Sequence, residues 1–176
     1  LVTAVLASAL AIVGWQAREA VAEASRAQAM QDFLAGLFEQ AGTASQGGQP
    51  LDLRGLLDAS VERGNRELAR QPRARAELLG VVARIRTGLG DYREAQALLD
   101  RQAAIIAATD EVPPSLLLES LAQRGQVLAR LGDPRACIDL MRPSLDLARR
   151  EQAQLPLQAS EFYSQLGRCH RGHGER

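Results

Sequence analysis

Cys169, His170 and His173 are the residues whose types and spacing come closest to a metal site. Cys169 and His173 are four positions apart, so they share one face of a helix, and thiolate and imidazole are both zinc ligands. These are the only two histidines of the chain, and no further ligand group accompanies them. We therefore predict an incidental surface cluster and no metal site.

The chain contains two cysteines, Cys137 and Cys169. They form no CxxC pair, and two cysteines at unrelated positions do not make a disulfide framework. Cys137 falls where the repeat described below needs a small buried residue, so we expect a packed thiol there. On this interpretation, cysteine usage does not indicate a redox compartment.

The sequence shows no catalytic motif. Gly88-Leu89-Gly90 is a GxG, but it lies between two helical patterns and follows no strand, so it does not predict nucleotide binding. A phosphate-binding loop, an HRD-type catalytic loop, a DFG triplet, a nucleophile elbow and an HExxH motif are missing. We predict no catalytic residue, no cofactor-binding residue and no metal ligand in this chain.

Composition predicts an all-α protein. Of the 176 residues, 46% are apolar and only 3% are aromatic, and the apolar set is mainly Leu, Ala and Val. Leu and Ala are strong helix formers, and the apolar content is enough for a core. The formal net charge is zero, from 21 basic and 21 acidic residues. This balance argues against a general nucleic-acid binder, which needs a basic surface.

The turn at residues 88–95 is the first of a series with a period of 42 residues. A glycine recurs in each turn, and a small residue recurs seven positions before that glycine. A bulky residue and an acidic residue recur further upstream in the same helical pattern. The recurring sets are Gly90, Gly132 and Gly174; Ala83, Gly125 and Gly167; Leu79, Leu121 and Tyr163; and Glu77, Glu119 and Glu161. A fixed period of this length is typical of stacked helical hairpins.

The N-terminal part differs from the repeats. Leu1 to Gly14 is a run of 14 residues without a charge, whereas a membrane span needs about 20. The chain does not begin with Met, so we expect a piece of a longer protein, with residues 1–15 as the C-terminal part of a transmembrane helix. Trp15 would be its interfacial anchor. The alternative is a buried helix of a soluble protein.

Residues 16–41 are expected to continue as a juxtamembrane helix. Phe33, Leu34, Leu37 and Phe38 share one face of it. This face would dock on the following domain or pair with a second copy in a homodimer. Residues 42–50 are rich in Gly and polar residues and predict a linker. Residues 51–70 predict an amphipathic helix that packs on the array, and residues 71–176 predict the array itself.

Within the array we expect helices over 72–87, from Asp91 to about 108, from Ser115 to near Gly132, from Asp133 onward, and from near Pro156 to near Gly174. Asp91 with Glu94 resembles a capping box. Ser115 and Asp133 are candidate caps, and Pro143 predicts a kink or an early end. We expect the Leu166–Gly167 face to be partly bare, because its partner helix would follow Arg176.

These residues resemble the tetratricopeptide repeat. Tyr163 and Leu166-Gly167 match the bulky residue and the Leu-Gly pair of that family, while Gly90, Tyr92 and Ala95 match its turn glycine, its aromatic and its small residue. Ala83, Pro134 and Cys137 depart from the pattern. The resemblance covers about residues 75–176, and it implies helical hairpins in which small residues such as Gly125 and Gly167 let helices approach closely.

The same resemblance implies a partner groove lined by the first helix of each hairpin. The positions that face it are Glu77, Gly80, Arg84 and Thr87; Glu119, Ala122, Gln126 and Ala129; and Glu161, Ser164, Arg168 and Arg171. A row of glutamates beside arginines and a glutamine suits an extended peptide of mixed charge. The alternative is a solvated face with ordinary ion pairs.

The order of apolar segment, helix and repeats is similar to the C-terminal half of bacterial membrane-bound serine/threonine protein kinases. That resemblance implies a single-pass inner-membrane protein with extracytoplasmic repeats and an upstream kinase domain that would use ATP and Mg²⁺. The alternatives are the tail of a membrane-bound winged-helix transcription regulator and a tetratricopeptide scaffold without a head domain. All three imply a non-catalytic region that binds protein or peptide and no nucleic acid.

Overall fold

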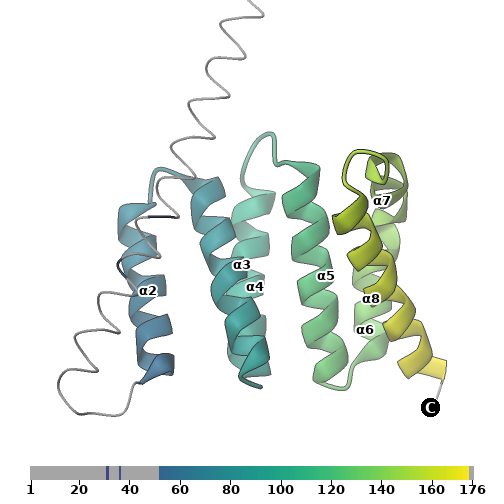
Figure 1. Ribbon diagram of the computed structural model, residues 1–176, viewed down its shortest axis with the longest axis horizontal. Coiled ribbons are helices and arrows are strands. Elements are labelled where there is room, and N and C mark those ends of the chain that lie inside the picture. Colours follow the sequence, from purple (N-terminus) through teal and green to yellow (C-terminus); the bar gives the residue numbers. More distant parts are fainter. Residues whose placement is uncertain (1–30, 32–35, 37–51, 175–176) are drawn as a thin grey trace, which may run out of the picture. The chain divides into compact units, whose positions relative to one another are not determined.

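The computed structural model of the chain describes Gln31, Gly36 and residues 52–174 (Figure 1). Gln31 and Gly36 are helical. Otherwise the expected transmembrane helix, juxtamembrane helix and linker lie outside the described residues. Among the described residues, no helix is both long and apolar enough to cross a membrane.

The described elements of residues 52–174 are all helical, as expected. They are α2 (Leu53–Glu67), α3 (Pro72–Gly88), α4 (Tyr92–Ala107), α5 (Pro114–Arg130), α6 (Pro134–Met141), the 3₁₀ helix η1 (Arg142–Ser144), α7 (Leu145–Glu151) and α8 (Pro156–Gly174). The chain divides into two compact units, Leu1–Ser60 and Val61–Arg176, with the boundary inside α2.

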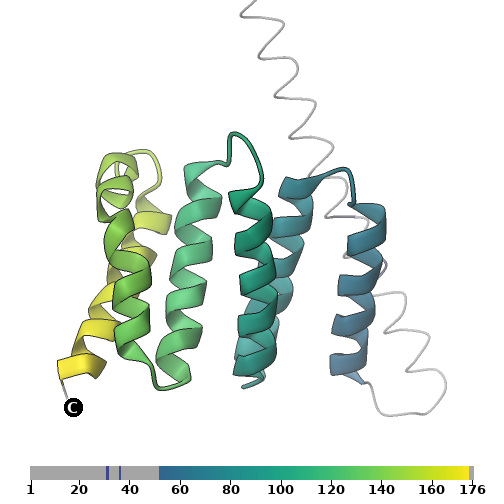
Figure 2. The same cartoon turned by 180° about the vertical axis from the view of Figure 1, so that it is seen from behind.

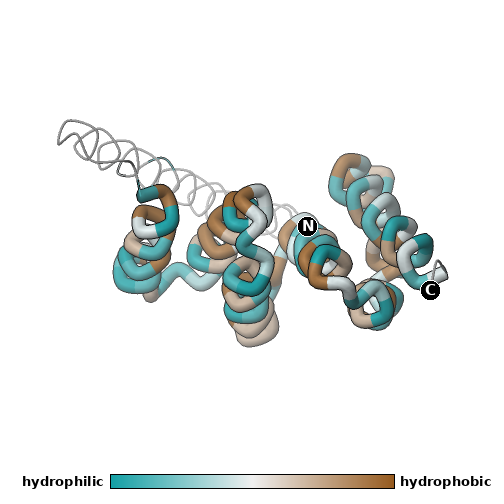
Figure 3. The backbone as a smooth tube through the Cα atoms, turned by 90° about the horizontal axis from the view of Figure 1, so that it is seen from below, coloured by the Kyte–Doolittle hydropathy of each residue, from teal (hydrophilic) through white to brown (hydrophobic). Residues whose placement is uncertain are grey.

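The helices of the second unit stack in two layers. Helices α3, α5 and α8 form one layer, in front in Figure 1, while α4, α6 and α7 come to the front in Figure 2. Helix α5 packs on both α3 and α4, and α8 packs in the same way on both α5 and α6. The helices are amphipathic, and hydrophilic and hydrophobic residues alternate around each of them in Figure 3.

The turns after α3 and α5 have the same backbone geometry 42 residues apart. Gly90 and Gly132 have φ values of 82° and 86°, which glycine adopts without steric cost. In the first turn, the amide of Asp91 donates to Arg86 O at 2.9 Å and that of Gly90 to Thr87 O at 3.2 Å. The second turn repeats both bonds at 2.9 and 3.2 Å. This is the Schellman arrangement, which satisfies carbonyls at the end of a helix.

The start of α4 differs from the expected capping box. Asp91 is at the N-cap, but its side chain accepts no hydrogen bond from the backbone of α4. Instead, its Oδ2 lies 3.1 Å from Nη1 of Arg86, and the Arg86 side chain is only 5% exposed. A buried guanidinium needs an anionic partner, so the carboxylate pairs with it in preference to capping the helix.

The start of α6 matches the sequence-based expectation. Asp133 Oδ1 accepts from the amide of Ala136 at 2.9 Å, and Pro134 is in the first turn. Ser115 does not cap α5. The N-cap residue is Pro113, and α5 has no side-chain hydrogen bond at its N-cap. The expected interruption at Pro143 is confirmed, since α6 ends at Met141 and η1 follows. Proline cannot donate the i→i−4 bond that would continue the helix.

The core of the last hairpin is a cluster of α5, α6, α7 and α8 side chains. Its buried members are Leu118, Cys137, Ile138, Met141, Ala148, Phe162, Leu166 and Cys169. A second cluster joins Ala83, Ala95, Leu99 and Val127, with Tyr92 packed against it. The expectation of a bare Leu166–Gly167 face is wrong for Leu166, which is 7% exposed because α6 and α5 already cover it.

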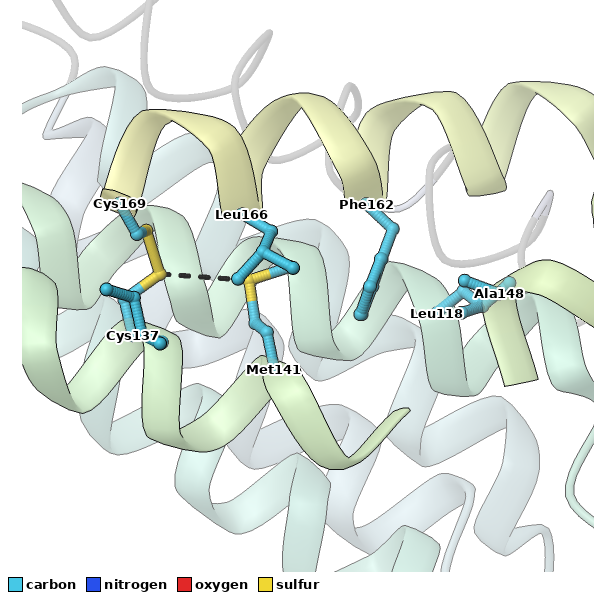
Figure 4. Close-up of a cluster of buried hydrophobic side chains, with 8 residues drawn as sticks. Leu118, Cys137, Met141, Ala148, Phe162, Leu166 and Cys169 are labelled. Atoms are coloured by element: carbon cyan, nitrogen blue, oxygen red, sulfur yellow. Dashed lines mark hydrogen bonds between the residues drawn. A yellow bond between two sulfur atoms is a disulfide. The ribbon is translucent and has the colours of Figure 1, made fainter. Parts of the chain in front are cut away.

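Cys137 and Cys169 are joined by a disulfide between α6 and α8 (Figure 4). The expected packed thiol at Cys137 is therefore wrong in its chemistry, although the residue is fully buried. The two Cα atoms are 6.1 Å apart, within the usual range for a disulfide. Sequence spacing alone did not predict this pair, because it depends on how α8 packs against α6.

Candidate partner face and its cleft

The candidate site is the face made by α3, α5 and α8. It carries the predicted groove residues Glu77, Arg84 and Thr87 on α3, Glu119 and Gln126 on α5, and Glu161, Ser164, Arg168 and Arg171 on α8. Those on α8 are exposed, as is Arg84, while the others are half-buried. Thr87 donates to Ala83 O of its own helix at 2.8 Å.

Arg84 and Glu119 are brought into contact across α3 and α5, where the guanidinium donates to Glu119 Oε1. Gln123 completes this cluster. With its amide nitrogen 3.0 Å from Gly80 O, its oxygen accepts from Arg84 Nη2 at 2.9 Å. The positive charge of Arg84 is therefore already balanced by a carboxylate within the protein.

A cleft of about 250 Å³ opens between α5 and α8. It is lined by Gln126, Ala129, Arg130, Gln165 and Arg168. The predicted positions Gln126 and Arg168 thus meet in one place, together with Ala129. Typical small-molecule pockets measure about 300–1,000 Å³, so this cleft suits a single side chain of a larger ligand.

Arg168 is held in the cleft by neutral groups. Its Nε donates to Gln165 Oε1 at 2.8 Å, and its Nη1 donates to Ser164 Oγ at 3.1 Å. Gln165 is itself fixed, because it is 2% exposed and its Nε2 donates to Cys169 Sγ at 3.4 Å. The disulfide, the buried amide and the guanidinium therefore form one continuous chain of contacts.

Sequence reasoning missed Gln123, Gln165 and Arg130. The two glutamines are 42 residues apart and are both buried on the inner side of the candidate face. A polar residue that recurs at a helix position expected to be buried is a signal that could have identified them. Arg130 could not have been found in this way, because it precedes the turn and is not among the groove-facing positions of the family.

The Cys169–His173 pair is not a metal site in this structure. The sulfur of Cys169 is bonded to Cys137 and is not available as a thiolate. His170 and His173 are exposed on the last turns of α8. Among the described residues, no group of three or more His, Cys, Asp or Glu side chains has the arrangement of a metal site.

Comparisons with known protein families, with curated proteins and with solved structures found no significant match to this chain.

Proposed function

We propose that residues 71–176 are a non-catalytic interaction region that binds an extended peptide or protein segment across α3, α5 and α8. The cleft between α5 and α8 is the observation that carries this proposal. It combines fixed polar side chains with a hollow at the position where the repeat resemblance expects a partner groove. A face with adjacent acidic and basic groups suits a ligand that lies along several helices.

The tetratricopeptide interpretation is part of the proposal. Two features of the second unit support it. The Schellman turns at Gly90 and Gly132 recur with the period of the sequence, and α5 packs on both α3 and α4 as α8 packs on both α5 and α6.

We further propose that the chain belongs to a membrane-anchored signalling protein, and specifically to a serine/threonine protein kinase. Residues 1–15 would contribute the membrane anchor, and residues 16–41 would transmit ligand binding and pair in a homodimer. The motivation is the order of apolar segment, helix and repeats. Determining the sequence upstream of Leu1 tests this part, and a DNA-binding domain there would overturn the kinase assignment.

An extracytoplasmic position of the repeats completes this proposal. The Cys137–Cys169 disulfide supports it, because disulfides form and persist in oxidising compartments and are rare in reducing ones. Acid quenching of intact cells, followed by alkylation of the denatured protein before and after reduction, would test the position, because the two cysteines should react only after reduction. Two free thiols in the protein isolated under acid quenching would contradict it.

Reversing the charge at Arg84 and Arg168 should weaken peptide binding. A peptide is first selected from a random display library on the immobilised 176-residue chain. Its affinity for the Arg84→Glu/Arg168→Glu variant is expected to fall by about tenfold or more, because favourable contacts become repulsive. Titration calorimetry measures this loss, and circular dichroism should show unchanged helicity.

Arg101→Glu, on α4 in the other layer, is the matched control and should change the affinity less than about twofold, as expected for a charge away from the interface. Selected peptides that bind the double variant as tightly as the parent would place their site elsewhere and contradict the groove.

A further inference from the structure

From the charges of the cleft, we infer that the α5–α8 cleft is a subsite for one acidic side chain, Asp or Glu, of the bound peptide. This inference rests on the proposed function and adds a ligand chemistry to it. Arg130 and Arg168 supply the positive charge, and Gln126 supplies a neutral amide at the same cleft.

Within the described part of the chain, the two arginines of the cleft have no acidic partner, in contrast to Arg84 and Arg124 on the same layer of helices. Arg84 pairs with Glu119, and Arg124 pairs with Asp100 at 3.4 Å beside a smaller cleft of about 50 Å³. Among residues 52–174, no carboxylate forms an ion pair with Arg130 or Arg168. Two uncompensated cations at one hollow favour an anionic ligand and disfavour a lysine or arginine side chain.

Arg168 has unused hydrogen-bond donors that such a ligand could accept from. A guanidinium has five N–H donors, and Arg168 uses two of them on Gln165 and Ser164. Both acceptors are uncharged, so the guanidinium is oriented without losing its charge. A carboxylate can therefore accept from the remaining donors in the paired geometry that arginine favours.

The orientation of Arg168 is also prepared in advance. Gln165 is buried and contacts the disulfide sulfur of Cys169, so it is fixed by the core and not by solvent. A donor that is held before the ligand arrives loses little conformational entropy on binding, which strengthens the contact.

The test is a double-mutant cycle between the cleft and the peptide. The probe is a peptide selected by display on the 176-residue chain, capped at both ends so that its only carboxylates are side chains. Changing its one contacting Glu to Gln is expected to lower the affinity about tenfold for the parent protein. For the Arg168→Gln variant, the same change should alter the affinity less than twofold. In the Arg130→Gln variant, the loss of affinity caused by the peptide's Glu-to-Gln change should be smaller than in the parent. In the Arg101→Gln variant, this loss should be the same as in the parent.

The outcomes separate this inference from the proposed function. The subsite would be overturned if the peptide's Glu-to-Gln change lowered the affinity in full for both Arg168→Gln and Arg130→Gln. It would also be overturned if selected peptides bound α3, α5 and α8 without an acidic residue. Either outcome would leave the peptide-binding face in place. Selected peptides whose affinity does not respond to Arg84→Glu/Arg168→Glu would instead overturn the proposed function, and the subsite with it.

Discussion

Reduction of the Cys137–Cys169 disulfide is expected to lower the free energy of unfolding of the helical array by about 2–4 kcal/mol. The bond closes a loop with a sequence separation of 32 and joins α6 to α8 inside the core. Opening it enlarges the conformational freedom of the unfolded chain, while the buried thiols still pack as small apolar groups. Urea unfolding followed by circular dichroism, with and without reductant, measures the difference.

The Cys137→Ala/Cys169→Ala variant is the control for this prediction. Its unfolding midpoint should lie near that of the reduced parent and should not respond to reductant. A parent protein whose midpoint is the same with and without reductant would contradict the prediction. Alkylation of both cysteines by iodoacetamide, when the protein is unfolded without prior reduction, would also contradict the prediction.

Gly125→Ala is expected to destabilise the fold by about 1–3 kcal/mol, although alanine is the better helix former. An added Cβ at Gly125 would lie 2.5 Å from Met141 Sδ and 3.1 Å from Cys137 Sγ. Met141 and Cys137 are both fully buried, and the disulfide fixes the cysteine, so neither can move away cheaply. Thermal or urea unfolding of the variant measures the cost.

Gly167→Ala is the matched control, because it makes the same chemical change at the same repeat position on α8. Its added Cβ would meet only Arg171 Nη1 at 3.8 Å, an ordinary contact. This variant should be as stable as the parent or more stable by up to about 1 kcal/mol. Equal effects of the two substitutions would show that helix propensity, and not the close approach of α5 to α6, decides the outcome.

The helices could largely be predicted from the sequence, because their signals are local. Pro134 with Asp133 determined the start of α6, and Pro143 determined where it ends. The cap expected at Asp91 failed for a non-local reason, since its carboxylate pairs with the buried Arg86. A capping motif is visible in a few consecutive residues, whereas the burial of a competing cation is not.

The candidate site was predictable in outline but not in its chemistry. The repeat register placed Gln126 and Arg168 on the same face as Arg84 and Glu119. It did not show that Arg84 is neutralised while Arg168 is not, because that difference depends on side-chain contacts. The disulfide behind the cleft was missed for the same reason, since periodicity does not reveal which sulfur atoms meet.

The most direct test of the peptide-binding face is to map where a selected peptide lies. The peptide would carry a photoreactive benzoylphenylalanine at successive positions, and the attachment sites on the 176-residue chain would be identified by mass spectrometry. We predict attachment to α3, α5 and α8, around Glu119, Gln126 and Ser164. Attachment confined to α4, α6 and α7 would contradict the central claim.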